Sequence, residues 1–203
     1  MNYTERPEPP TRIPHWFYGG VCVPEGSSIM AYRDYIHTPV TPRDIRWGLQ
    51  QGAVAGIVAG LVFAAFEMTA SAFMMGAEAF FMPLRMIGAI ALGPEALDPG
   101  YSLLTASIAG VIVHLILAII YGIVFGEIAS MLRGSAAFIG LGSVFGLALW
   151  LVNFYVIAPI AFPWFLQASP VVQFLAHTFF FGTVLGWFLW KSHERSGLEG
   201  PAA

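Results

Sequence analysis

Residues 48–75 read GLQQGAVAGIVAGLVFAAFEMTASAFMM, and a stretch this long and this apolar decides the class of the fold. A membrane-spanning helix needs about 20 apolar residues, each adding about 1.5 Å of length. Three further stretches meet this requirement, at residues 103–131, 135–157 and 170–190. The composition agrees, because only 10% of the residues are charged, against about 25% in soluble domains. The sequence therefore predicts an all-α integral membrane protein built as a bundle of four transmembrane helices.

The nine Lys and Arg residues are distributed unevenly across these spans. Arg85 falls in a loop on one side of the membrane, and all the others fall on the side of the two termini. By the positive-inside rule, this asymmetry places both termini in the cytoplasm. The chain has no basic run or nucleic-acid-binding motif, so nucleic acid is not an expected partner.

The segments outside the spans give the domain organisation. Residues 1–46 form a Pro-rich cytoplasmic arm, which we expect to have little regular structure by itself and to be disordered or laid across a partner. Residues 47–191 form the transmembrane domain, and residues 192–203 form a short cytoplasmic tail. Residues 80–92 are apolar but too short to cross a membrane, which predicts a re-entrant or interfacial helix after the first span.

Small residues recur at four-residue spacing in every span, which puts them on one face of each helix. Such faces let helix backbones approach closely, either within a compact bundle or against other subunits. The glycines predicted to pack in this way are Gly52, Gly56, Gly60, Gly122, Gly126, Gly142, Gly146, Gly182 and Gly186.

Methionines gather near the outer end of the first span and in the loop that follows. They are Met68, Met74, Met75, Met82 and Met86. Thioether sulfurs can bind copper(I), but methionine is also a flexible filler of apolar space. We favour the second interpretation, because no cysteine accompanies the cluster.

Each span carries one polar side chain in its outer half. These residues are Glu67, His114, Asn153 and His177. Counting from the outer ends of the spans at about 1.5 Å per residue puts them at depths of roughly 7 to 16 Å. An ionisable residue inside a span costs roughly 2.5–3.5 kcal/mol or more. A polar layer of this kind therefore needs an explanation.

The polar layer has several competing interpretations. Its four side chains could form interhelical hydrogen bonds that fix the register of the helices, which is the interpretation we favour. His114 and His177 could ligate one b-type haem, or Glu67, His114 and His177 could bind a metal ion. A buried Glu with a His could instead relay protons or hydrogen-bond a quinone, assisted by Tyr121 and Tyr155.

Two motifs follow the first span, FFMPLRMIG at residues 80–88 and LGPEAL at residues 92–97. Together with Glu67 and His114, they resemble a group of small four-span bacterial membrane proteins. The resemblance covers the first two spans best. It implies the four-span fold, fits a location in the bacterial inner membrane, and marks Glu67, Arg85 and His114 without attaching an activity to them.

The function is constrained mainly by motifs that the chain lacks. There is no nucleotide-binding loop, nucleophile elbow, metalloprotease HExxH or cysteine pair for an iron–sulfur cluster. We therefore expect a non-catalytic accessory subunit of a larger membrane complex, of the respiratory or photosynthetic electron-transfer kind. Its expected partners are other integral membrane subunits, lipids and a quinone. The alternatives are a b-haem-binding or quinone-reactive anchor that uses His114 and His177, and a small metal or solute transporter.

Overall fold

The computed structural model describes residues 15–18, 21–24 and 42–196. The chain divides into two units, Met1–Val40 and Thr41–Ala203. The described residues of the first unit form two short strands, and those of the second unit are almost all helical.

In the first unit, strands β1 (His15–Tyr18) and β2 (Val21–Pro24) pair as an antiparallel hairpin in which Phe17 lies opposite Cys22. The arm was expected to have little regular structure, and the structure differs at these residues. The strands consist mostly of aromatic and β-branched residues, which favour extended backbone. In the sequence, two glycines separate them, and a two-residue connection of this kind is typical of a hairpin. The rest of the arm up to residue 41 lies outside the described residues.

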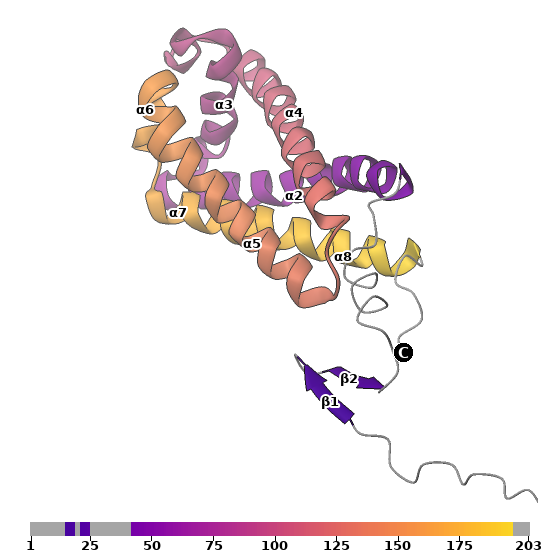
Figure 1. The fold of residues 1–203 in the computed structure, drawn as a ribbon. Coiled ribbons are helices and arrows are strands. Elements are labelled where there is room, and N and C mark those ends of the chain that lie inside the picture. The colour runs from indigo at the N-terminus through magenta and orange to yellow at the C-terminus, as the bar shows by residue number, and fades with distance from the viewer. Residues whose placement is uncertain (1–14, 19–20, 25–41, 197–203) are drawn as a thin grey trace, which may run out of the picture. The chain divides into compact units, whose positions relative to one another are not determined.

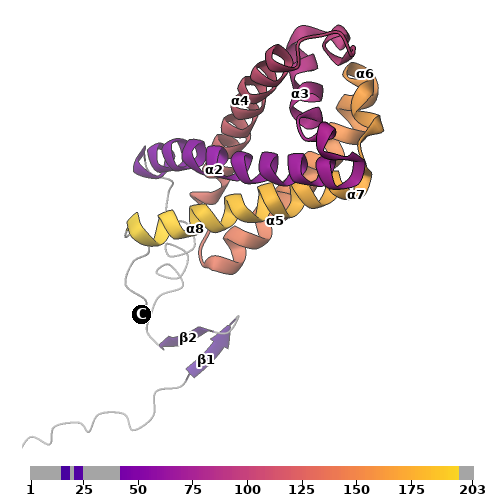
Figure 2. The same cartoon turned by 180° about the vertical axis from the view of Figure 1, so that it is seen from behind.

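The second unit contains four helices that are long and apolar enough to span a membrane, which confirms the predicted fold class. The first span is α2 (Pro42–Met75) and the second is α4 (Leu103–Ala129). The third span joins α5 (Ser135–Val152), a π-helical turn η3 (Asn153–Ile157) and α6 (Ala158–Ala161). The fourth joins α7 (Pro170–Leu175), a π-helical segment η5 (Ala176–Thr183) and α8 (Val184–Ser196). Figure 1 shows their arrangement, and Figure 2 shows α2 and α8 running side by side.

The fourth span continues past its predicted end at Trp190. Charged residues occupy this last part of α8, where Lys191 and Glu194 form an exposed ion pair of 3.0 Å. Such residues end an apolar stretch without ending a helix, because side chains three or four residues apart can pair along a helical surface. Hydropathy therefore located the apolar part of this helix and missed its polar extension.

The connection between α2 and α4 contains the predicted short helix, α3 (Met82–Leu92), between the 3₁₀ turns η1 (Ala77–Ala79) and η2 (Pro94–Leu97). Pro83 occupies the first turn of α3, where its missing N–H costs nothing. Gly93 ends the helix with φ 89°, a left-handed backbone conformation that glycine adopts without strain. Helix α3 packs against α4, where Gly88 meets Ala106 and Gly110 meets Leu84. We call this end of the bundle the α3 end.

Glycine faces join the helices in two pairs. In the α2–α4 pair, Gly52 and Gly56 lie against Gly122 of α4, and a Cβ added at Gly52 would be 2.5 Å from the Gly122 carbonyl oxygen. In the pair of the third and fourth spans, Gly142 and Gly146 lie against Gly182. The remaining predicted glycines, Gly60, Gly126 and Gly186, extend the same contacts. The glycine faces are therefore used within the chain.

The core lies between these two pairs. Its largest fully buried apolar side chains are Phe125 of α4, Phe138 of α5, and Leu185 and Leu189 of α8. Toward the α3 end, α4 diverges from α2 and α8, and α3 lies between α4 and α6 (Figure 1). This divergence leaves room for side chains that a tightly packed bundle would exclude.

Candidate functional site

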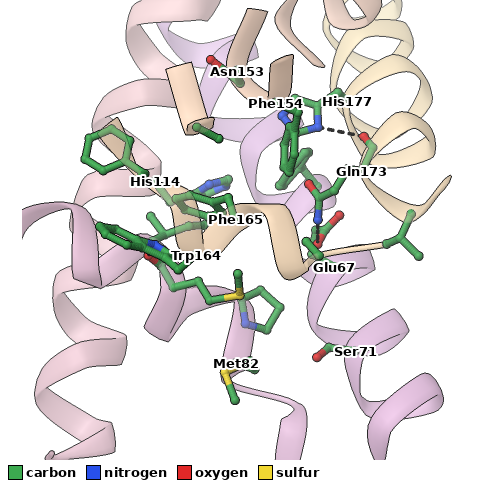
Figure 3. A pocket seen from close by; sticks show the side chains of 18 of the residues that line it. Glu67, Ser71, Met82, His114, Asn153, Phe154, Trp164, Phe165, Gln173 and His177 are labelled. Atoms are coloured by element: carbon green, nitrogen blue, oxygen red, sulfur yellow. Dashed lines mark hydrogen bonds between the residues drawn. The ribbon is translucent and has the colours of Figure 1, made fainter. Parts of the chain in front are cut away.

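The divergence of the helices leaves an open cavity of about 850 Å³ at the α3 end. Its walls come from all four spans, from α3 and from η4 (Pro163–Gln167), the 3₁₀ turn between α6 and α7. All four members of the predicted polar layer line this cavity, namely Glu67, His114, Asn153 and His177 (Figure 3). Depth along the membrane was predictable, and the structure adds that the four side chains share one space.

Glu67 is buried in the cavity wall, with 6% of its surface exposed. Its Oε2 accepts a hydrogen bond of 2.7 Å from Nε2 of Gln173, which is also buried and comes from α7 (Figure 3). The other carboxyl oxygen, Oε1, is buried and has no hydrogen-bond partner. A buried carboxyl oxygen without a partner carries a free-energy cost unless something else satisfies it. Glu67 is therefore the residue of the cavity wall most in need of a ligand.

Gln173 also fixes the orientation of His177. Its backbone carbonyl lies 2.8 Å from Nδ1 of His177, one helical turn further along the fourth span. Because a carbonyl oxygen only accepts, Nδ1 carries the proton and Nε2 of the neutral ring is an acceptor. One residue, Gln173, thus holds both Glu67 and His177.

His114 is held in a similar way from the opposite wall. Its Nε2 lies 2.8 Å from the carbonyl oxygen of Gly60 on α2. The proton of a neutral ring then sits on Nε2, and Nδ1 is the acceptor. Each histidine therefore uses one ring nitrogen on a backbone carbonyl, which also satisfies a polar side chain within a span.

The ring of Phe63 lies between the two histidines. It stacks on His114 at a centroid distance of 5.4 Å and meets His177 edge-on at 4.8 Å. A haem ligated by both histidines would need the space that Phe63 fills, and the Nε2 atom of His114 would have to leave Gly60. The arrangement therefore does not fit the predicted b-type haem between His114 and His177.

The predicted metal triad is not assembled either. Within residues 42–196 and the hairpin, no group of three or more His, Cys, Asp or Glu side chains lies close enough together to hold a metal ion. Glu67 turns its Oε2 to Gln173, and Phe63 separates the histidines. These residues share a cavity without converging on one point.

A second polar pair lines another wall of the cavity. The hydroxyl of Tyr121 on α4 donates to Oδ1 of Asn153 at 3.5 Å. Asn153 begins the π-helical turn η3, and His177 lies in the π-helical segment η5. Segments of π-helix are frequently found at functional sites. Tyr155, the other predicted assistant, is 62% exposed and does not line the cavity.

The rest of the lining is mostly apolar and rich in aromatic rings, and its other polar members are Ser71, Gln167 and Ser169. Phe154, Phe165, Phe181 and Trp164 contribute to it, and Trp164 donates from Nε1 to the backbone carbonyl of Met86 at 3.0 Å. This bond joins η4 to α3 across the α3 end. Of the predicted methionine cluster, Met74, Met75, Met82 and Met86 line the cavity and Met68 does not.

Arg85, marked by the sequence motif, has a structural role. Its Nε donates to the carbonyl of Ala96 at 2.7 Å, and its Nη2 donates to the carbonyl of Asp98. These bonds tie α3 to the segment that follows it. Arg85 does not line the cavity.

Gln173 and Phe63 are the site residues that sequence reasoning missed. Gln173 stands four residues before His177, so the two lie on one helical face, and this spacing was a usable signal. Phe63 stands four residues before Glu67 in an apolar stretch, where nothing marked it out. No family model, curated protein or solved structure matches this chain.

Proposed function

We propose that this protein binds a membrane quinone in the cavity at the α3 end, and that it does so as a non-catalytic subunit. The observation that carries the proposal is the buried, unpartnered Oε1 of Glu67 in the wall of a cavity large enough for a small-molecule ligand. A ligand that hydrogen-bonds this oxygen would remove the cost of its burial.

The lining supports a lipophilic ligand with a compact polar head. Most of it is apolar, and five of its side chains are phenylalanines or tryptophan in addition to Phe63. Among the described residues, no Lys or Arg lines the cavity. A phospholipid would therefore bring its phosphate next to Glu67 without a cation to pair with it, which makes phospholipid the poorer ligand.

Two polar pairs on different walls support a ring with two oxygens. Glu67 and Gln173 come from α2 and α7, and Tyr121 and Asn153 come from α4 and η3. A quinone carries its two oxygens on opposite sides of an aromatic-sized ring. Such a head can place one oxygen beside each pair while its faces pack against the aromatic side chains.

The wider role that we propose is an accessory subunit of a respiratory or photosynthetic electron-transfer complex in the bacterial inner membrane. The Lys and Arg distribution supports an orientation with both termini in the cytoplasm and the α3 end outward. Helix α4 also carries an exposed apolar face that lipids or a neighbouring subunit would cover. Its members are Leu104, Ile108, Ile112, Ile116, Ile120 and Val124.

Quinone binding is tested by measuring the quinone that co-purifies with the protein. The full chain is purified from native membranes in a mild detergent, and the quinone per chain is measured after solvent extraction. We expect retained quinone in the wild type and in Thr69→Val, whose exposed position lies on α2 outside the cavity. Glu67→Leu should retain about tenfold less, because a hydrogen bond to a charged group contributes about 1.5 kcal/mol or more. Equal retention by all three proteins would refute the site, and no quinone in any of them would refute the function.

The accessory role is tested separately. Native membranes are solubilised gently, complexes are separated on a native gel, and the companions of this chain are identified by mass spectrometry. Co-migration with a large redox assembly is the expected result. Migration alone, as a monomer or small oligomer, would refute the accessory role and leave the quinone site to be judged on its own assay.

A further inference from the structure

We infer that the cavity prefers the reduced quinol form of its ligand over the oxidised quinone, with Glu67 as the residue that discriminates and Gln173 as the residue that positions it. This inference rests on the proposed function. It follows from which cavity atoms lack a hydrogen-bond partner and from what those atoms can accept or donate.

The unpartnered polar atoms around Glu67 are acceptors. Oε2 of Glu67 is already paired with the Gln173 amide, so Oε1 is the free carboxyl oxygen. His177 uses Nδ1 on the carbonyl of Gln173, which leaves Nε2 as an acceptor. To pair with these two atoms, a ligand must therefore supply hydrogen-bond donors.

Several of the cavity's donors are already in use, and one proton of the Gln173 amide is committed to Glu67. The Nε2 proton of His114 is directed to Gly60, and the hydroxyl of Ser71 donates to the carbonyl of Ala79 at 2.8 Å. The indole N–H of Trp164 donates to Met86. A quinone offers only acceptor oxygens, so it would form no hydrogen bond with Oε1 of Glu67 or Nε2 of His177. A quinol offers two O–H donors and suits this side of the cavity.

Gln173 makes the discrimination possible, because it decides which carboxyl oxygen remains free. It is itself buried and comes from a different span than Glu67, so the pair is held rigidly between α2 and α7. Without its amide, both carboxyl oxygens would lack a fixed partner. Gln173 is therefore a positioning residue rather than a direct ligand.

The experiment compares two redox forms of one ligand. A benzoquinone with a decyl tail is added to the detergent-solubilised full chain, either oxidised or chemically reduced under nitrogen, and binding is followed by quenching of tryptophan fluorescence. We expect the wild type to bind the quinol about tenfold more tightly, the value of one hydrogen bond to a carboxylate. The control Thr69→Val should keep this preference.

The variant Glu67→Gln gives the sharpest test. The substituted side chain keeps an oxygen for the Gln173 amide and turns an NH₂ group, a donor, toward the cavity. We expect this variant to lose the preference for quinol or to reverse it, and Gln173→Leu to weaken the preference while both forms still bind.

Each other outcome has a distinct meaning. Equal affinity for both forms in the wild type, unchanged in Glu67→Gln, would overturn the inference and leave the proposed quinone site standing. Binding of neither form would overturn the proposed function itself. Tighter binding of a decyl-tailed ammonium than of either form, lost in Glu67→Gln, would overturn both and assign the cavity to amphipathic amines, which aromatic walls and a carboxylate also suit.

Discussion

Replacing Gly142 with alanine tests whether backbone contact at glycines holds the third and fourth spans together. A Cβ added at Gly142 would lie 2.5 Å from the carbonyl oxygen of Gly182 and 3.0 Å from the Cα of Gly186. Ordinary van der Waals contact begins at 3.4 Å, so the two backbones must separate by about 0.9 Å, the difference between 3.4 and 2.5 Å. Overpacking of this kind costs about 1–3 kcal/mol.

Helix α5 offers a matched control two residues away. Gly140 has no atom within 4 Å of an added Cβ, and its position is exposed. Both substitutions gain the same helix propensity, about 1 kcal/mol. The difference in unfolding free energy between Gly140→Ala and Gly142→Ala therefore isolates the overpacking cost, and we expect it to be about 1–3 kcal/mol.

The assay is reversible unfolding in mixed micelles, in which a mild detergent is titrated with a denaturing one and helix loss is followed by circular dichroism. Gly142→Ala should unfold at a lower fraction of the denaturing detergent than Gly140→Ala. The reasoning would be refuted if the two variants unfolded together. In that case, the close backbone contact at Gly142 would make no contribution to stability that alanine could not also make.

Three further results are expected. Trp164→Phe removes the hydrogen bond between η4 and α3 and should lower the unfolding free energy by about 1 kcal/mol, as measured in the same micelles. The purified protein should show no b-type haem absorption band after reduction, because Phe63 fills the space between the histidines; a band that disappears in His114→Ala would contradict this. Deleting residues 2–44 should leave membrane insertion intact and weaken partner association on native gels, and normal assembly of the truncated chain would show that the arm is dispensable.

The sequence was sufficient for the spans and for their glycine faces, because hydropathy and four-residue spacing are local patterns. It was also sufficient for the short helix α3, bounded by Pro83 and Gly93. Each of these features is decided within one helix. None of these features had to be predicted from contacts between helices.

The site was only half predictable, for a physical reason. Counting residues gives depth along a helix but not the direction in which a side chain points relative to other helices. His114 and His177 were placed at similar depth, and the sequence could not reveal that Phe63 stands between them. The π-helical segments around Asn153 and His177 add to this difficulty. Each rotates the side chains that follow it about the helix axis, relative to their positions in a regular α-helix.

The two helix pairs that pack through glycines, α2 with α4 and the third span with the fourth, form two similar halves of the transmembrane unit. Glu67 follows Gly60 in the first half by the same number of residues as Asn153 follows Gly146 in the second half. The cavity lies where the halves meet, and each half contributes one of these polar side chains to it. A chain severed between α4 and α5 would keep both glycine contacts whole, so the cavity should form again when the two fragments meet in one membrane. The protein is therefore built from two helical hairpins that pack together within one polypeptide chain.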